Sequence, residues 1–332
     1  MSIGPHKFEF EVVKGWEQLP EGWSFVEVAG VAVDSKDRVY VFNRGDHPVI
    51  VFDKEGKFIK AWGEGIFKSS HGIFIDKQDT IYLTDDFDHT VRIFDTDGNM
   101  KMMLGESGVA ADTGYRVDES PVLYASKPFN RVTNVAKAPN GDLYVADGYG
   151  NARVHRFSAD GKLKQSWGTP GRGPGEFILV HAVAVDSANR VYVADRENSR
   201  IQIFNQDGLF LNMWTWVNRP NDIFIDDQDQ IHIAELGWSK PVRTRIHDCA
   251  MCNAPAGHDP IARVTVCDPD GKIIARVGGH NPLLPGNFIA PPGLWCDSGG
   301  DLYVGEVILR GGAISHLAPF KPPAFQKFKR SG

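Results

Sequence analysis

The sequence contains few cysteines and no run of positive charge. Only four of its 332 residues are cysteine, and all of them fall in the last quarter, at Cys249, Cys252, Cys267 and Cys296. Cysteines so few and so concentrated exclude a disulfide framework for the whole fold. The formal net charge is −6, and no cluster of lysine and arginine offsets it. We therefore expect no nucleic-acid partner.

Long apolar segments are also missing. No stretch approaches the roughly 20 apolar residues that a membrane-spanning helix requires. The N-terminal MSIGPHKFEFEVVKGW lacks the basic start and the apolar run of a secretory signal. These absences predict a cytoplasmic protein without a membrane partner.

Short strands take the place of helices. Residues 181–214 contain no helix-length periodicity; they read HAVAV, VYVAD, RIQIF and LFLNMW, separated by the turn-forming SANR, ENS and NQDG. The same unit recurs at 29–63, 71–105 and 133–168. A repeat of roughly 40 residues with four strands per copy is typical of a β-propeller, an all-β fold.

Aligning the repeats gives the number of blades. The second strand of each unit ends at a polar residue, and these residues are Asn43, Asp85, Asp147, Asp195, Glu235 and Glu306. Fourteen positions earlier lies a second row: Ala29, His71, Thr133, His181, Asn221 and Pro292. Six units predict a six-bladed propeller, and the second row is expected to ring one mouth of its central channel.

The repeat runs almost from end to end, which favours a single domain over residues 1–332. Two insertions interrupt it, at about 106–131 and 237–262. Residues 8–16, FEFEVVKGW, match the end of a repeat and have no blade in front of them. We expect this N-terminal strand to complete the C-terminal blade and thereby close the ring.

Two histidines of the mouth row suggest metal binding. His71 and His181 belong to alternate blades, so their imidazoles are expected to converge over the channel and share a divalent ion, most simply zinc. The alternative is that each histidine only caps its own inner strand. Pro292, at the matching position of the sixth blade, cannot ligate a metal.

The second insertion contains HDCAMCNAPAGHD. Its His247, Cys249, Cys252 and His258 are spaced closely enough for one structural zinc. A redox-active cysteine pair and an ordered loop with free thiols are the alternatives. A further hypothesis is that His247 or His258 folds over the mouth and supplies the third ligand for His71 and His181.

Other polar residues at the mouth suggest acid–base chemistry on an acidic substrate. Tyr149 follows the second strand of the third blade, where it can move a proton. Arg44 and Arg196 follow the second strands of the first and fourth blades, where a guanidinium can grip a carboxylate, and Asn221 is a further candidate substrate ligand. Packing of Tyr149 and a structural turn at Arg196 are the alternatives. The recurring acids at the second-strand ends are read as structural hydrogen-bonding residues.

Several long strings resemble one enzyme family. DGYGNARV, the SWG and PGEF segment and HAVAVDSANRVYVADRENSRIQIF, extended by FNRGDH at 42–47 and HGIFID at 71–76, resemble peptidyl-α-hydroxyglycine α-amidating lyase. The resemblance implies a six-bladed propeller with a zinc held by three histidines, a tyrosine base and a nearby arginine. It also implies cleavage of the N–C bond of a carbinolamide to give an amide and glyoxylate.

By position, the resemblance assigns zinc ligation to His71 and His181, the base to Tyr149 and the arginine to Arg44. The third zinc histidine falls on Pro292, so another residue completes the coordination sphere or the metal is gone. The family's cysteine after the tyrosine is Gly150 here, which removes a disulfide and agrees with a reducing compartment.

Three functional classes follow. The first is a metal-assisted lyase or hydrolase acting on a small acidic or amide-containing substrate in the channel, which is the reading we favour. The second is a metal-free enzyme that uses the histidines as acid and base. The third is a binding scaffold of the NHL type without catalysis. Neither the substrate nor the oligomeric state follows from the sequence.

Overall fold

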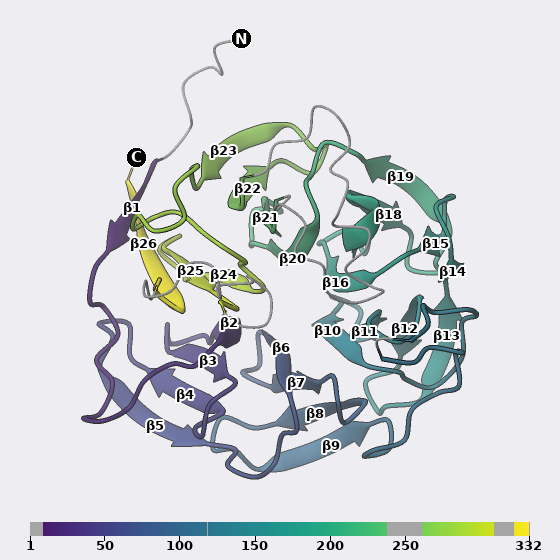
Figure 1. Ribbon diagram of the computed structural model, residues 1–332, viewed down its shortest axis with the longest axis horizontal. Coiled ribbons are helices and arrows are strands. Elements are labelled where there is room, and N and C mark those ends of the chain that lie inside the picture. Colours follow the sequence, from purple (N-terminus) through teal and green to yellow (C-terminus); the bar gives the residue numbers. More distant parts are fainter. Residues whose placement is uncertain (1–8, 118, 238–260, 309–321, 332) are drawn as a thin grey trace.

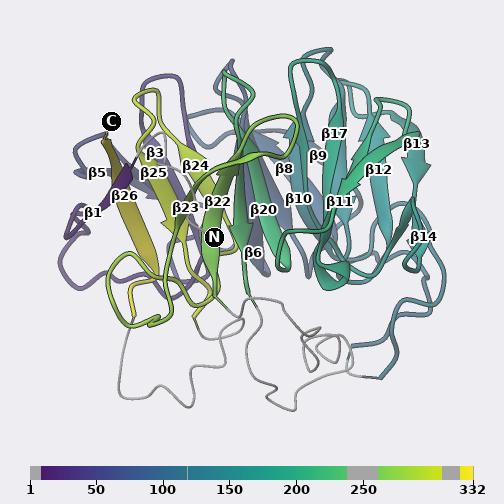
Figure 2. The same cartoon turned by 90° about the horizontal axis from the view of Figure 1, so that it is seen from above.

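The computed structural model describes residues 9–117, 119–237, 261–308 and 322–331. The repeats fold into six four-stranded antiparallel sheets arranged as blades around a central axis (Figure 1). Seen from the edge, the inner strands run through the thickness of the disc (Figure 2). The all-β, six-bladed propeller predicted from the repeats is confirmed.

The first three blades follow one another along the chain. Blade one contains β2 (Val28–Val33), β3 (Val39–Asn43), β4 (Val49–Phe52) and β5 (Phe58–Trp62); blade two contains β6 (Ser70–Ile75), β7 (Ile81–Asp85), β8 (Thr90–Phe94) and β9 (Met100–Leu104); blade three contains β10 (Val132–Lys137), β11 (Leu143–Asp147), β12 (Arg153–Phe157) and β13 (Leu163–Trp167). The first insertion lies between β9 and β10, so it joins blades two and three.

A short parallel pair, β14 (Thr169–Pro170) and β15 (Glu176–Phe177), leads into the second half. Blade four contains β16 (Val180–Val185), β17 (Val191–Asp195), the 3₁₀ turn η1 (Arg196–Asn198), β18 (Arg200–Phe204) and β19 (Phe210–Trp214); blade five contains β20 (Pro220–Ile225), β21 (Ile231–Glu235), β22 (Arg263–Cys267) and β23 (Ile273–Val277). The second insertion falls between β21 and β22, and residues 238–260 of it lie outside the described residues.

The sixth blade is built from both ends of the chain. It contains β24 (Leu294–Cys296), β25 (Leu302–Gly305), β26 (Phe325–Ser331) and, as its outermost strand, β1 (Glu9–Val13). β1 pairs antiparallel with β26 over five residue pairs, from Glu9 with Ser331 to Val13 with Lys327. Closure of the ring by the N-terminal strand is thus confirmed, with the strand itself shorter than the 8–16 stretch that predicted it.

The blades pack on one another through buried aliphatic and aromatic side chains. The second strand of every complete repeat is buried on both faces, whereas the outermost strands are half exposed. The tryptophan that ends an outer strand lies under the turn glycine of the next blade: Trp62 under Gly98, Trp167 under Gly208, and Trp214 under Gly271. The tryptophan at the end of one blade therefore packs against the glycine of the DG turn in the next blade, and this contact recurs between blades.

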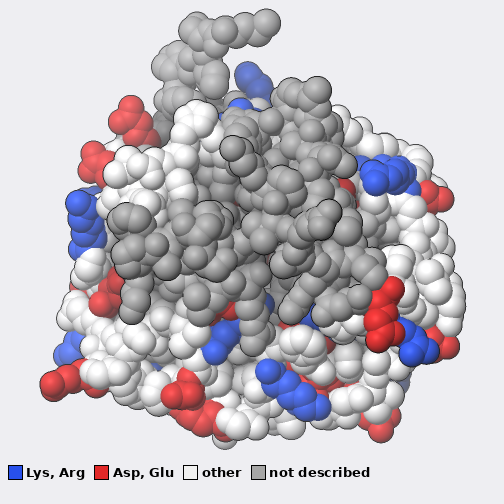
Figure 3. Space-filling view, in the orientation of Figure 1, with Lys and Arg blue, Asp and Glu red and all other residues white. Residues whose placement is uncertain are grey.

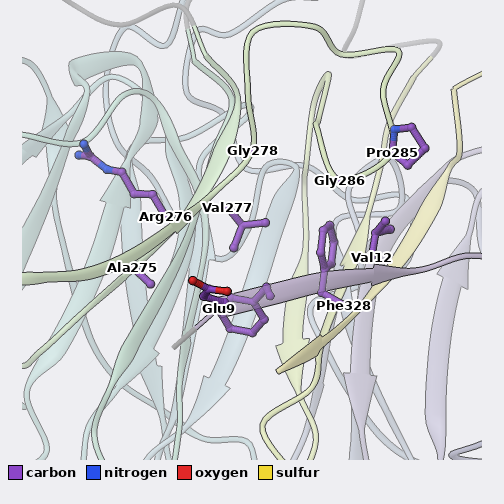
Figure 4. Close-up of a pocket in the computed structure, with 10 residues that line it drawn as sticks. Glu9, Val12, Ala275, Arg276, Val277, Gly278, Pro285, Gly286 and Phe328 are labelled. Carbon is purple, nitrogen blue, oxygen red and sulfur yellow. The ribbon is translucent and has the colours of Figure 1, made fainter. Parts of the chain in front are cut away.

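The rim carries a groove at the point of closure. Figure 4 shows it between β1 and β23, with Val12, Val277 and Phe328 as apolar walls and Glu9 and Arg276 at its edges. Charged side chains of both signs alternate around the rim of the face shown in Figure 3. Among the described residues, no helix has the length and apolarity needed to cross a membrane.

Side chains cross the central channel at several levels. Toward the end of the channel away from the histidines, Trp295 of blade six contacts Phe74 of blade two and Phe224 of blade five, with ring centroids 5.6 and 4.6 Å apart. Blades two and six are not neighbours, so Phe74 and Trp295 meet inside the channel. Nearer the histidines, Asn134 of blade three donates to Asp222 of blade five at 3.2 Å. The described inner strands therefore line a small cavity beside His71, His181, Asn134 and Asp222, and an aromatic floor of Phe74, Phe224 and Trp295 lies beyond it.

Candidate functional site

The mouth row lies on a β-bulge in every one of the first five blades. The pairing between first and second strand shifts register across Ala29, His71, Thr133, His181 and Asn221. A bulge inserts an unpaired residue and turns its side chain away from the regular alternation. The bulges therefore aim the row residues at the channel mouth, and Pro292, just before β24, lines the same cavity as the two histidines.

His71, His181 and Tyr149 meet at this mouth. The Tyr149 hydroxyl lies 3.1 Å from Nε2 of His71 and 3.0 Å from Nε2 of His181. The two imidazole rings are 4.9 Å apart between centroids. The structure thus brings together three of the residues that the sequence predicted to act as one site.

The protonation state of each imidazole follows from the hydrogen bond that its Nδ1 makes. Nδ1 of His71 lies 2.6 Å from the carbonyl oxygen of Thr133, and Nδ1 of His181 lies 2.6 Å from that of Asn221. A carbonyl oxygen only accepts, so each Nδ1 carries the proton and each Nε2 presents a lone pair. Burial lowers the pKa of His71 to about 4 and, together with the nearby positive charge of Arg196, holds the pKa of His181 well below its usual value. Both rings are therefore neutral near pH 7.

The donor set at the mouth fits a divalent cation. Two Nε2 lone pairs face one hydroxyl group, whose single proton satisfies only one of them at a time. At the other Nε2, the nitrogen lone pair faces a lone pair of the Tyr149 oxygen at about 3 Å, and the two repel each other. A cation bound between these two atoms would attract both. Among the described residues, no group of three or more His, Cys, Asp or Glu side chains is arranged to hold a metal ion, so an ion here would have only two histidine ligands from this part of the chain. His71 and His181 would therefore hold such an ion with the Tyr149 oxygen beside it.

A cluster of ionic side chains lies beside the histidines. Arg196 and Arg219 are both buried and share one carboxylate, that of Glu197, at 2.7 and 2.8 Å. Burial lowers the pKa of the Arg196 guanidinium, but Glu197 and Tyr149 more than offset it, so the pKa is raised. Arg196, Glu197 and Arg219 thus form one buried ionic cluster next to the histidines.

Known proteins similar to this chain fall into two groups. The model of the NHL repeat matches residues 177–204. The human NHL repeat-containing protein 3 is 31% identical over 250 residues, which cover 70% of this chain and 69% of that protein. The chain belongs to the NHL repeat-containing protein family.

Two further matches of this NHL repeat protein are a local one to a lyase and a structural one to a lactonase. A probable peptidyl-α-hydroxyglycine α-amidating lyase of Caenorhabditis elegans is 43% identical over 76 residues, which cover 22% of each chain. The solved structure of a gluconolactonase from Xanthomonas campestris has a TM-score of 0.60 at 15% identity, covering 93% of this chain and 87% of that chain. The first match is local, and the second shows the shared propeller fold.

Two of the predicted substrate residues of this NHL repeat protein are tied to the protein itself. The Arg44 side chain donates to the carbonyl of Ser70 at 3.0 Å and to Glu27 at 3.2 Å. Its charge contributes to the lowered pKa of both histidines, after burial. Asn221 is buried and donates to the carbonyl of Pro291 at 3.0 Å, while its own carbonyl fixes His181. Asn221 therefore positions a histidine.

The remaining candidates of the sequence analysis divide into two sets. His247, His258, Cys249 and Cys252 lie outside the described residues. The acids at the second-strand ends are structural, as expected, because each accepts backbone N–H groups from the loop that enters its blade: Asp85 from Lys68 and Ser69, Asp147 from Asn130, Asp195 from Ile178, Glu235 from Asn218, and Glu306 from Ala290.

Sequence reasoning missed Asp86 and Arg131. Arg131 pairs with Asp86, donates to the Tyr115 hydroxyl at 3.0 Å, and places its guanidinium 5.0 Å from the centre of the Tyr149 ring. Burial alone would raise the pKa of Asp86, but the charges of His71 and Arg131 keep it below its usual value. Both residues occupy recurring positions of the repeat, Asp86 directly after the second strand and Arg131 two residues before the mouth row. Reading those two positions across the six repeats would have revealed the charges.

Proposed function

We propose that this NHL repeat protein is a metal-assisted lyase or hydrolase that acts on a small acidic or amide-containing substrate at the mouth of its channel. The observation that carries the proposal is the convergence of two neutral imidazole lone pairs on the Tyr149 hydroxyl. A bound divalent ion would polarise a hydroxyl, carbonyl or water oxygen there.

The protein's own residues would supply proton transfer and substrate binding. Tyr149 lies between the histidines, where its hydroxyl is placed to give its proton to a leaving nitrogen and to recover one from a substrate hydroxyl. The guanidinium of Arg196 lies 5.6 Å from the centre of the Tyr149 ring, where it would bind the carboxylate of an acidic substrate. The aromatic floor formed by Phe74, Phe224 and Trp295 limits the depth that a ligand can reach.

The reaction implied by the local likeness to amidating lyases balances without an oxidant. In a carbinolamide acid, the hydroxyl oxygen loses its proton, the carbon–nitrogen bond breaks with its electrons moving to nitrogen, and the nitrogen regains a proton. The products are an amide and glyoxylate. Hydrolysis of a small amide or ester would use the same groups, with water as the nucleophile.

Elemental analysis of the purified protein tests the metal. We expect about one equivalent of zinc or another divalent ion, lost in His71→Ala and in His181→Ala and retained in Tyr149→Phe. His280→Ala is the matched control, because His280 is an exposed histidine between blades five and six. Metal that is absent, or indifferent to both histidine variants, would sink the metal-assisted reading.

A substrate screen tests the chemistry. Hydroxyglycine amides and small acidic amides are offered to the metal-loaded protein and to its variants. In Tyr149→Phe we expect kcat to fall by about 10²–10⁴, the usual contribution of a general acid–base group, with the metal still bound. Activity that survives chelation would point to the metal-free use of the histidines. A protein that holds metal but turns over none of these substrates would point to the binding scaffold.

A further inference from the structure

The loop that carries Tyr149 is fitted between two parts of the molecule. A Cβ atom added to Gly148 would lie 1.8 Å from the carbonyl oxygen of Val180, the residue before His181. One added to Gly150 would lie 2.1 Å from Oδ1 of Asn130. Tyr149 is therefore flanked by two positions at which only glycine fits, one against blade four and one against the end of the first insertion.

The first insertion holds this loop from the other side. The buried Thr113 hydroxyl donates to the carbonyl of Gly150 at 2.6 Å. Asn130 donates to the Thr113 oxygen at 3.2 Å and to the carbonyl of Ala111 at 2.9 Å. The Thr113 hydroxyl thus accepts from Asn130 and donates to Gly150, in a chain of bonds that ends on the carbonyl of the residue after Tyr149.

A second tie lies one residue further along. The side chain of Asn151 is fully buried. It donates to the carbonyl of Ser126 at 2.9 Å and accepts from the backbone N–H of Ser126 at 3.2 Å. Ser126, like Thr113, belongs to the insertion. The backbone N–H groups of Tyr149 and Gly150 donate to the carbonyls of Arg131 and Asn130 at 3.3 and 3.0 Å. The described part of the insertion therefore binds the Tyr149 loop along its whole length.

We propose that Thr113 is a positioning residue for Tyr149, and that the insertion at 106–131 braces the tyrosine loop against the histidine pair. The inference rests on the role of Tyr149 proposed above. Its physical basis is that Tyr149 bridges histidines from blades two and four, so its hydroxyl must be held in place on the axis between them. A displacement of about 1 Å at a reacting group is enough to lower turnover by about 100-fold.

The test is the ring signal of Tyr149 in the metal-free protein. The protein contains eight tyrosines, and labelling them with ¹³C gives a set of ring signals from which Tyr149→Phe identifies one. In Thr113→Val, which removes the hydroxyl at nearly constant volume, we expect the Tyr149 signal to shift or broaden while tyrosines remote from the insertion, such as Tyr192 and Tyr303, stay in place. Tyr115 is left out of this comparison, because its backbone N–H also lies 3.4 Å from the Thr113 oxygen. Thr113→Ser restores the hydroxyl and is expected to restore the signal.

Thr90→Val is the matched control. Thr90 is a buried threonine of blade two whose hydroxyl makes only a 3.5 Å contact with Asp88, so the Tyr149 signal should not respond. If Thr113→Val fails to fold, Thr113→Ala takes its place, because it removes the same hydroxyl and places no new methyl group where the oxygen was. A Tyr149 signal unchanged in the folded variant would overturn the proposal, and so would equal movement of all the tyrosine signals.

Turnover separates this proposal from the proposed function. Where a substrate is found, Thr113→Val should lower kcat by about 10–100-fold and change KM little. If the Tyr149 signal moves but no substrate is turned over, the positioning role of Thr113 is supported and the proposed enzymatic function is wrong. If the enzyme is active and Thr113→Val changes neither kcat nor the Tyr149 signal, the positioning role of Thr113 is wrong and the proposed function is supported.

Discussion

Glu306 differs from the other acids in its row in having no cation beside it among the described residues. In blades two to five, the third strand supplies a basic partner: Arg92 for Asp85, His155 for Asp147, Arg200 for Asp195, and Arg263 for Glu235. In blade six, the positions equivalent to these basic residues are Ala324, just before β26, and Gln326, within β26. Neither carries a positive charge. Burial accordingly raises the pKa of Glu306 to about 8, although two backbone N–H groups bind its oxygens.

This raised pKa predicts a pH-dependent stability. An unfolded glutamate titrates near 4.3, so the folded protein holds the Glu306 proton more tightly. The stabilisation that this proton provides is present below about pH 4 and is lost as the pH rises through about 8. We expect the unfolding free energy of the wild-type protein, relative to Glu306→Gln, to fall by on the order of 4 kcal/mol over that range.

Urea unfolding of both proteins at several pH values measures the difference. Blade one shows that an amide suits this position, because Asn43 accepts the backbone N–H of Val26 at 3.0 Å. Glu235→Gln is the control, since Arg263 pairs with this carboxylate and the substitution should destabilise at neutral pH. Parallel pH profiles for the wild type and Glu306→Gln would show that Glu306 is already ionised in the folded protein.

The sequence predicted single residues well where they repeat and poorly where they do not. His71 and His181 were found because the row position is fixed by strand length, and Tyr149 was found because it follows the second strand of its blade and matches the tyrosine of the amidating-lyase resemblance. Arg131 pairs with Asp86 from a different blade, and its contact with Tyr115 depends on how an irregular insertion returns to the mouth. No local pattern encodes such a return, because the path of an insertion is set by tertiary packing.

At the scale of strands and turns, the outer hairpins of neighbouring blades are coupled. Gly208 lies in the turn between β18 and β19 with φ at +72°, and a Cβ added there would lie 2.8 Å from the ring of Trp167 in blade three. Gly141, in the turn between β10 and β11, has φ at +87° and nothing within 4 Å of its added Cβ. The two glycines share the left-handed conformation and differ in their neighbour.

Alanine at these two turns separates the two effects. Gly141→Ala should cost about 1–2 kcal/mol of unfolding free energy, from the left-handed backbone alone. Gly208→Ala adds displacement of the Trp167 ring, and overpacking of this kind costs typically 1–3 kcal/mol more. Chemical denaturation measures both variants. Equal losses would mean that the tryptophan moves aside freely and that the turn glycines serve conformation only.

The repeat itself explains why the strands and turns were predictable. Alternating VYVAD and RIQIF segments with DG turns encode a four-stranded sheet locally, and the following Trp and Gly encode how one sheet stacks on the next. The six-bladed count follows from the number of copies. By contrast, the aromatic floor depends on Phe74, Phe224 and Trp295, which come from three blades and meet only after the ring has closed.

For the whole molecule, closure depends on the N-terminal segment. β1 supplies the fourth strand of blade six, and Trp16 after it is buried at the seam. The Trp16 ring contacts Phe52 of blade one at 5.7 Å, and Tyr303 and Phe325 of blade six at 5.3 and 5.7 Å. The segment thus joins the first and last blades both by hydrogen bonds and by an aromatic cluster.

Removal of residues 1–16 should therefore destabilise the entire ring. It uncovers the edge of β26, which favours pairing between molecules, and it removes Trp16, whose loss alone costs about 3–5 kcal/mol in a buried site. We expect a lower melting temperature, a shift toward larger species in size-exclusion chromatography, and a single transition, because every blade depends on its two neighbours. Trp16→Ala with β1 intact should show the lower melting temperature without the larger species. A truncated chain that melts like the intact one and stays the same size would mean that five complete blades and a three-stranded sixth hold the ring closed by themselves.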